Sequence, residues 1–273
     1  MRMYSIDLIA LDLDGTLVDD DGNVSPGNRR AVRAAVNAGV RVALVTGRGA
    51  DLPARLVHEL RLNVPSICAH GALTKDFLSG RTIDHIPVPL QHAVALLEYA
   101  ERRGFDAAVY SEERFLRAHG APLHMDDMRL PHWHAVTSLR EAVSTPPTFL
   151  RFFGSEAVAE IRSTFAHLPL HFKHEVFGDL EECAVTSAEA TKEIALARLC
   201  AGLQIAPERV LAIGDSRNDV PMLRWAGVGV AMGNALPEIR REVGLVTGDC
   251  RDDGAAEAIR RYALRDVPSA LSA

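Results

Sequence analysis

The feature that most constrains this chain is a mostly apolar run, residues 6–11, that ends in Asp12-Leu13-Asp14-Gly15-Thr16. A short run of this kind predicts a buried strand. Residues two apart on a strand share a face, so Asp12 and Asp14 are expected to project together where the strand leaves its sheet. Ligands of open parallel sheets bind beyond the carboxyl ends of the strands, and two acids placed there favour a hard cation between them.

Apolar runs and helical patterns alternate in both flanks of the chain, which predicts a doubly wound parallel α/β sheet. Strands are expected at residues 6–11, 40–45, 65–69, 209–213, 228–231 and 245–247, with helices at 25–38, 52–60, 189–203, 220–226 and 253–262 and a further helix after residue 235. A second strand ends in acids, at Gly214-Asp215-Ser216-Arg217-Asn218-Asp219, and another ends in Thr46-Gly47-Arg48, which suits an anion. Lys192 lies in the first turn of a predicted helix, where acids are usual.

The middle of the chain has a different rhythm, which predicts an inserted α+β domain with an antiparallel sheet. Helices are expected at 90–103 and 156–165, with β-like runs at 106–110, 148–153, 171–177 and 180–186. We therefore expect a discontinuous core at 1–82 and 188–273 and an insertion at 83–187, with a hinge near 81–86 and 185–189. Histidines crowd residues 119–134, but their spacing fits no standard metal site, which favours a loop facing solvent or substrate.

Composition limits the class of function. The net charge of −6 over 273 residues argues against a surface for nucleic acid or anionic lipid. The 4 cysteines are scattered without metal-like spacing, as expected in a reducing compartment. We find neither a signal-peptide pattern nor an apolar run long enough to span a bilayer. A soluble, cytoplasmic protein is expected, as a monomer or small homo-oligomer.

Taken in order, the Asp12, Thr46, Lys192 and Gly214 segments resemble the four motifs of the haloacid dehalogenase (HAD) superfamily. The segment Val230-Ala231-Met232-Gly233-Asn234-Ala235 resembles more narrowly its Cof-type branch of sugar-phosphate phosphatases. The stretch between Asp14 and Thr46 is too short for a folded cap, so the cap would lie between Thr46 and Lys192, as in that branch. The sequence departs from the pattern at His70, where Asn is common, and at Glu193, where Gly is common.

The resemblance implies a Mg²⁺-dependent phosphatase that hydrolyses small phosphorylated metabolites, with sugar phosphates foremost, through an aspartyl-phosphate. Asp12 would be the nucleophile and Asp14 the general acid and base. The metal would be held by Asp12, the backbone carbonyl of Asp14, and Asp215, while Asp219 would orient Lys192 or a metal-bound water. The phosphate would be bound by Leu13, Thr46, Gly47, Lys192 and Asn218. Candidate contacts to the leaving group are Arg48, His70, Arg117 and His119.

Three alternatives stay open. A phosphomutase on the same core would pass the phosphoryl group to a second hydroxyl instead of water. A phospho-accepting signalling module also places acids, a hydroxyl and a lysine at strand ends, but it has no need of Asp14 or of a large lid. A sugar-phosphate-binding regulator without activity is the third alternative, although every acid that the chemistry demands is present.

Overall fold

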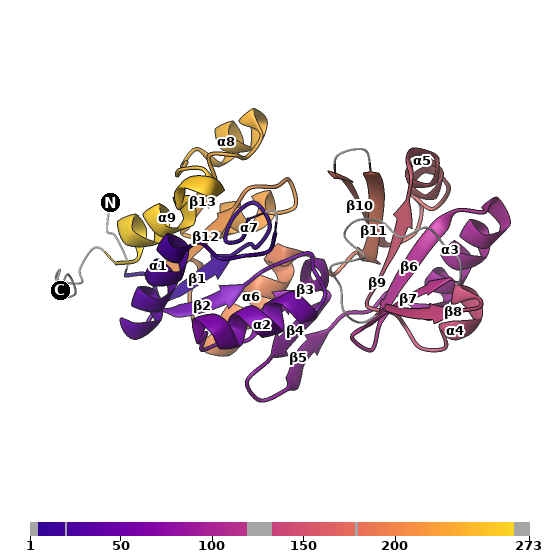
Figure 1. The fold of residues 1–273 in the computed structure, drawn as a ribbon, viewed down its shortest axis with the longest axis horizontal. Coiled ribbons are helices and arrows are strands. Elements are labelled where there is room, and N and C mark those ends of the chain that lie inside the picture. The colour runs from indigo at the N-terminus through magenta and orange to yellow at the C-terminus, as the bar shows by residue number, and fades with distance from the viewer. Residues whose placement is uncertain (1–4, 20, 119–132, 178–179, 265–273) are drawn as a thin grey trace. The chain divides into compact units, whose positions relative to one another are not determined.

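Two units make up the chain, and each is described by itself (Figure 1). Our computed structural model describes residues 5–19, 21–118, 133–177 and 180–264. Unit 1 comprises Met1–Arg48, Leu52–Ile83 and Thr191–Ala273, and unit 2 comprises Gly49–Asp51 and Asp84–Ala190. Among the described residues, every helix is too short or too polar to reach across a bilayer.

A parallel sheet forms the centre of unit 1. Strand β1 (Leu8–Leu11) lies between β12 (Val210–Gly214) and β2 (Arg41–Leu44), and β13 (Val228–Ala231) pairs with the far edge of β12. Leu11 pairs with Leu44 on one side and with Ile213 on the other, so the three strands end at the same level. The expected strand at 245–247 is reduced to a single parallel bridge between Ala231 and Val246.

Helices cover both faces of this sheet because β1 is apolar on both. Ile9 and Leu11 pack in one cluster with α1 (Pro26–Asn37), α2 (Asp51–Leu60) and α9 (Gly254–Tyr262). Leu8 and Ala10 pack in another with α6 (Lys192–Leu203) and α7 (Val220–Trp225), and α8 (Pro237–Val243) follows β13. Helices α1 and α9 lie side by side, as Figure 1 shows. The predicted doubly wound fold is confirmed.

Capping residues decide where the helices begin. The Ser25 side chain accepts a hydrogen bond from the Asn28 N–H at 3.0 Å, and Pro26 starts α1. The Thr191 hydroxyl accepts from the Ile194 N–H at 3.1 Å, so α6 begins at Lys192. The sequence-based start of this helix at residue 189 was therefore wrong by three positions, because the cap at Thr191 sets the first turn.

A small second sheet follows the parallel one in unit 1, and most of it was missed from the sequence. Its strands are β3 (Ser66–Cys68), β4 (Leu73–Asp76) and β5 (Arg81–His85), in that order, with a 3₁₀ turn at Ala69–Gly71 between the first two. No residue of β5 is buried, so its sequence lacks the alternation by which half-buried strands are found.

Unit 2 contains a six-stranded sheet in the order β10-β11-β9-β6-β7-β8. The strands are β6 (Asp106–Ser111), β7 (Arg114–Ala118), β8 (Trp133–Val136), β9 (Phe149–Phe153), β10 (Leu170–Phe177) and β11 (Leu180–Ser187). All neighbours are antiparallel except β7 and β8. Strands β7 and β8 and the short helix α4 (Leu139–Ala142) were not predicted.

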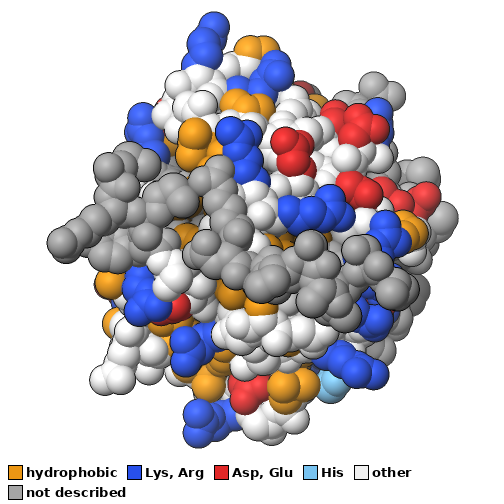
Figure 2. Space-filling view, turned by 90° about the vertical axis from the view of Figure 1, so that its left-hand side faces the viewer, with side chains coloured by type: hydrophobic (Ala, Val, Ile, Leu, Met, Phe, Trp, Pro, Cys, Tyr) orange, Lys and Arg blue, Asp and Glu red, His pale blue; other side chains and the backbone are white. Residues whose placement is uncertain are grey.

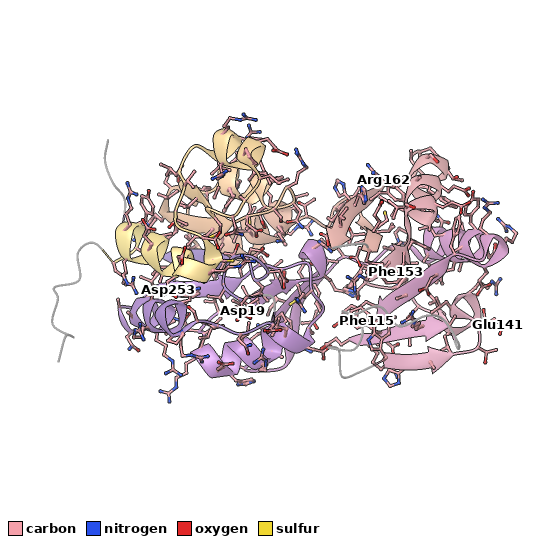
Figure 3. The ribbon with its side chains drawn as sticks, turned by 45° about the horizontal axis from the view of Figure 1, so that its top comes forward. Asp19, Phe115, Glu141, Phe153, Arg162 and Asp253 are labelled. Carbon is pink, nitrogen blue, oxygen red and sulfur yellow. The ribbon has the colours of Figure 1, made fainter. Side chains whose placement is uncertain are left out.

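The two faces of the unit 2 sheet differ. Leu150, Phe152 and Val185 belong to the apolar core that α3 (Leu90–Arg103) and α5 (Ser155–Thr164) cover. Phe115 and Phe153, labelled in Figure 3, lie outside that core. Phe115 instead packs on Tyr110, with ring centroids 4.6 Å apart. One face is therefore a helix-covered core, and the other carries aromatic and charged residues.

The surface carries charges of both signs. On the face shown in Figure 2, Lys and Arg side chains lie among acidic and apolar ones and do not merge into one broad basic field. This mixture agrees with the net charge of −6.

Candidate active site

The acids that end β1 and β12 lie together. Asp12 continues the ladder beyond β1, since its N–H donates to the Ile213 carbonyl at 3.0 Å. Carboxylate oxygens of Asp12, Asp215 and Asp219 all lie within 4.8 Å of one another. Neighbouring parallel strands that end at one level bring their following residues to one edge of the sheet.

Lys192 bridges two of these acids. Its Nζ donates to Asp12 Oδ1 at 2.7 Å and to Asp219 Oδ1 at 2.6 Å, and its side chain is 3% exposed. Burial alone would lower the pKa of Lys192, but the charges of Asp12 and Asp219 outweigh it and raise the pKa above the ordinary value. The ammonium is therefore fixed in its charged form between two carboxylates.

The 3₁₀ turn at Ala69–Gly71 packs against the start of α6, where Lys192 lies. Gly71 has φ +103°, and a Cβ there would lie 2.2 Å from the Thr191 carbonyl oxygen. Only glycine both adopts this φ and lets the Ala69–Gly71 turn approach the backbone at Thr191 so closely.

Asp219 has both carboxylate oxygens engaged. Oδ1 accepts from Lys192, while Oδ2 accepts from the N–H of Asp215 at 3.2 Å, the N–H of Ser216 at 3.0 Å and the Ser216 hydroxyl at 2.8 Å. Asp219 thus organises the loop after β12 from a fully buried position. The structure places it against Lys192, as anticipated, and leaves Asp12 and Asp215 as the carboxylates of the cluster that a cation could use.

Two hydroxyls complete this arrangement. The Thr16 Oγ1 donates to Asp215 Oδ1 at 3.1 Å, and the Ser216 Oγ, which donates its proton to Asp219, also lies 2.7 Å from the side-chain amide of Asn218. Sequence reasoning assigned no role to Thr16 or Ser216. The sequence feature that could have pointed to them is a hydroxyl residue within a few positions of an acid at a strand end.

The electrostatics of the cluster call for more positive charge than Lys192 supplies. Burial, followed by the charge of Asp219, raises the pKa of Asp12 well above its ordinary value despite Lys192. Burial and the charge of Asp219 also raise the pKa of Asp215 to about 6. Carboxylate oxygens are hard ligands, and a divalent cation would relieve this repulsion. The residues therefore fit Mg²⁺, the metal that the resemblance of the motifs implies.

We expect Mg²⁺ to stabilise the protein more at pH 7.5 than at pH 5. Because the pKa of Asp215 is higher in the folded protein than in the unfolded chain, protonated Asp215 stabilises the metal-free fold. This contribution is complete below pH 4 and is lost as the pH rises through about 6. At pH 7.5 the ionised site would gain about 2–3 kcal/mol from Mg²⁺ at one hundred times its Kd. Thermal unfolding with and without Mg²⁺ measures the difference.

The matching variant is Asp215→Asn. It removes one buried negative charge, so metal-free Asp215→Asn is expected to melt above wild type at pH 7.5 and to lose the Mg²⁺ shift. An unchanged Mg²⁺ shift in this variant would place the cation elsewhere.

Gly15 leaves space for the Asp215 carboxylate because it has no Cβ. Its φ is +71°, and a Cβ at this position would lie 2.5 Å from Asp215 Oδ2. Gly22 has φ +74° but nothing closer than 3.9 Å to such a Cβ. We expect Gly15→Ala and Gly22→Ala to share a backbone cost of about 1 kcal/mol, while Gly15→Ala alone also weakens Mg²⁺ binding by displacing Asp215. Equal Mg²⁺ titrations for the two variants would contradict this.

The expected phosphate-binding residues come from the segments that follow β1, β2 and β12. Thr46 is fully buried, and its Oγ1 accepts from the Arg48 N–H at 3.1 Å. Gly47 packs closely against His70, and a Cβ on Gly47 would lie only 2.4 Å from the imidazole ring. Leu13 is buried between the two aspartates of its motif. Asn218 lies in the loop that Asp219 holds.

The Asp14 side chain is not part of the acidic cluster of the described residues. Its carboxylate is 45% exposed and forms an ion pair with Arg48, in which the shortest bond is 2.6 Å, from Nη2 to Oδ1. Arg48 was expected to contact the leaving group. In the structure it pairs with Asp14, the predicted acid and base.

The other candidates for substrate contact belong to both units, and one of them lies outside the described residues. His70 is 4% exposed, adopts φ +57° and donates its backbone N–H to the Thr46 carbonyl at 3.0 Å. Arg117 belongs to unit 2, where it donates to Asp106 Oδ2 at 3.1 Å and lies over the Trp133 ring. His119 lies outside the described residues.

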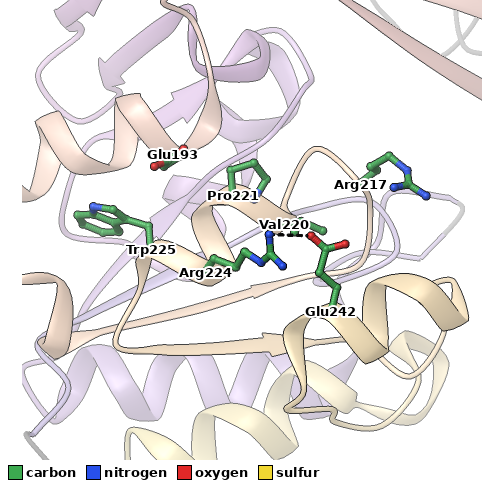
Figure 4. Close-up of a pocket in the computed structure, with 7 residues that line it drawn as sticks. All are labelled: Glu193, Arg217, Val220, Pro221, Arg224, Trp225 and Glu242. Atoms are coloured by element: carbon green, nitrogen blue, oxygen red, sulfur yellow. Dashed lines mark ion pairs between the residues drawn. The ribbon is translucent and has the colours of Figure 1, made fainter.

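A cavity of about 510 Å³ lies in unit 1, lined by residues of α6, α7 and α8 and of the loop before α7 (Figure 4). Glu193 and Arg217, which line it, are chain neighbours of Lys192 and Asn218. Arg224 and Glu242 form an ion pair across its wall at 3.0 Å, drawn as a dashed line. None of the acids of the cluster lines this cavity.

Comparison with known proteins identifies the family of this chain. A family model described as haloacid dehalogenase-like hydrolase matches residues 9–259. The pyridoxal phosphate phosphatase YbhA of Escherichia coli is 26% identical over 94% of this chain and 98% of its own length. The Bacillus subtilis 5-amino-6-(5-phospho-D-ribitylamino)uracil phosphatase YcsE is 28% identical over 95% of this chain and 96% of its own.

Solved structures share the whole fold. A haloacid dehalogenase-like hydrolase from Bacteroides thetaiotaomicron superposes with a TM-score of 0.84 at 23% identity, over 94% of this chain and 99% of that one. The HAD subclass IIB sugar phosphatase BT4131 superposes with a TM-score of 0.82 at 22% identity, over 94% and 99% of the two chains. At these identities the likeness establishes the fold alone.

Proposed function

This chain belongs to the haloacid dehalogenase-like hydrolase family, and from that membership we propose a Mg²⁺-dependent phosphatase that acts through an aspartyl-phosphate on Asp12. The chain is a phosphoric monoester hydrolase of phosphorylated metabolites, as its named relatives are. The observation that carries the finer proposal is the Lys192 ammonium held between Asp12 and Asp219 with Asp215 alongside.

Asp12 is the proposed nucleophile. Lys192 fixes its Oδ1, so Oδ2 is the oxygen that would attack phosphorus in line. A P–O bond to Asp12 forms while the bond to the ester oxygen breaks, and Asp14 gives its proton to the departing alkoxide. Water then attacks the same phosphorus as Asp14 takes a proton from it, which releases phosphate and restores Asp12.

The remaining groups of the site would bind the metal and the charged phosphate. Asp12 and Asp215, with the Asp14 carbonyl, would hold the metal. When bound, Mg²⁺ neutralises charge so that an anionic nucleophile can approach an anionic ester. Lys192, the Thr46 hydroxyl, the Asn218 amide and the backbone N–H groups of Leu13 and Gly47 would bind the phosphate oxygens.

We assign the choice of substrate to unit 2, as a cap of about residues 83–187 on a core of 1–82 and 188–273. Its sheet carries Arg117 on the face opposite the core that α3 and α5 cover, and Arg117 opposes Ala108 there. The proposed substrates are phosphate esters of small alcohols, with sugar phosphates foremost. Pyridoxal phosphate and phosphorylated flavin precursors are included because relatives are named for such substrates.

The test is a panel of phosphorylated metabolites with Mg²⁺, read out as released phosphate. The panel holds hexose and pentose phosphates, a phosphorylated polyol, pyridoxal phosphate and a flavin-precursor phosphate. In ¹⁸O-labelled water a phosphatase incorporates label into the released phosphate, whereas a phosphomutase leaves the transferred group unlabelled. Absence of turnover with every ester would contradict the proposal.

A further inference from the structure

Arg48 grips the Asp14 carboxylate with a guanidinium fork. Its Nε donates to Oδ2 at 2.8 Å and to Oδ1 at 3.0 Å, and its Nη2 donates to Oδ1 at 2.6 Å. Both oxygens of Asp14 are therefore oriented by one side chain. A planar fork fixes the plane of a carboxylate as well as its position, which a lysine does not do.

The backbone of Arg48 is anchored on both sides. Its N–H donates to the Thr46 Oγ1 at 3.1 Å, and its carbonyl accepts from the Ala69 N–H at 2.7 Å. The fork thus projects from a fixed point at the end of β2, next to the proposed phosphate-binding residues. Asp14 and Arg48 both belong to unit 1.

The exposure of the pair argues against a role in stability. The Asp14 side chain is 45% exposed and that of Arg48 is 29% exposed, and pairs this open to water contribute little to folding. An exposed Asp side chain without such a fork would sample several rotamers. What Arg48 supplies is a fixed direction for one carboxylate.

We propose that Arg48 is a positioning residue for Asp14, acting on protonation of the leaving group and not on recognition of the substrate. This rests on the proposed phosphatase mechanism. As Asp14 gives its proton to the departing oxygen, it acquires the negative charge that the fork binds best. The Arg48 contacts therefore strengthen during the first chemical step, which is the condition for accelerating it.

The role predicts an effect that depends on the leaving group. Phenyl phosphate and p-nitrophenyl phosphate are similar in shape, but p-nitrophenolate departs without a proton and phenolate benefits from one. With Mg²⁺ present, we expect Arg48→Ala to lower kcat/KM about 30-fold on phenyl phosphate and less than about 3-fold on p-nitrophenyl phosphate. Arg48→Lys keeps the charge but loses the fork, so its values are expected in between.

A double-mutant cycle with Asp14→Asn tests whether Arg48 acts through Asp14. In the Asp14→Asn background, adding Arg48→Ala is expected to leave the ratio of the two kcat/KM values unchanged. The matched control is Arg209→Ala. Arg209 also pairs with an aspartate, Asp7, at 2.5 Å, but at the opposite ends of β12 and β1, and its loss is expected to leave both substrates unaffected.

The outcomes separate this proposal from the phosphatase itself. An equal fall on both esters, or a fall that persists in the Asp14→Asn background, would show that Arg48 touches the substrate and would overturn the positioning role alone. Hydrolysis of neither ester by wild type, with no ester of the metabolite panel turned over, would overturn the phosphatase and the positioning role together.

Discussion

Asp12→Asn is expected to abolish turnover while the protein stays folded. The amide cannot form the phosphoryl bond, so kcat should fall by a factor on the order of 10⁴ or more. Its oxygen can still accept the hydrogen bond from Lys192. Because burial and the neighbouring acids raise the pKa of Asp12, a neutral group at this position is expected to leave metal-free stability at pH 7.5 equal or higher. Phosphate release with Mg²⁺ and thermal unfolding measure the two effects.

The control for Asp12→Asn is Asp7→Asn, just before the same strand. Asp7 pairs with Arg209 and lies away from the acidic cluster, so Asp7→Asn should keep wild-type turnover. Turnover close to wild type in Asp12→Asn would exclude the covalent mechanism. A collapse of the fold in Asp12→Asn would contradict the electrostatic argument, since removal of one buried charge is expected to be tolerated.

Lys192→Met is expected to cost both stability and turnover. Methionine has a similar length but leaves Asp12 and Asp219 as buried carboxylates without their common cation. Breaking a buried pair in this way costs about 3–5 kcal/mol. The variant should also lose the cation proposed to bind phosphate. Denaturant unfolding at pH 7.5 without Mg²⁺ gives the free energy of unfolding.

Two further variants make this expectation specific. Lys192→Met combined with Asp219→Asn removes one of the stranded charges and should recover part of the lost stability. Lys75→Met removes an ammonium that lies 5.8 Å from the centre of the Phe77 ring in the same unit, and it should cost less than about 1 kcal/mol. Equal losses for Lys192→Met and Lys75→Met would show that the bridge between the acids contributes nothing.

Comparison of the two units shows where sequence patterns suffice. Strands β1, β2 and β12 were predicted because they are buried on both faces and read as continuous apolar runs. Strands β5 and β8 were missed because no residue of either strand is buried, so neither shows the continuous apolar run of a buried strand. The parallel pairing of β7 with β8 was not foreseen either, because pairing direction leaves no mark on strands so short.

The candidate site divides in the same way. Residue type and local spacing placed acids at the ends of neighbouring strands and a lysine at the start of a helix. They did not show that Asp219 uses both of its oxygens, or that Thr16 donates to Asp215. Arg48 was a candidate for contact with the substrate, and its ion pair with Asp14 was not foreseen.

By itself, the sequence determined the sheet, the order of its strands along the chain and the carboxylates that end two of them, because strand periodicity and strand termination are local properties. Only the tertiary structure decided which side chains form hydrogen bonds and ion pairs with one another. Asp12, Lys192 and Asp219 come from three distant segments, and the geometry that joins them depends on how the helices pack on the sheet. Burial of the Lys192 ammonium is tolerated because that packing brings carboxylates to it, and no local sequence pattern specifies this.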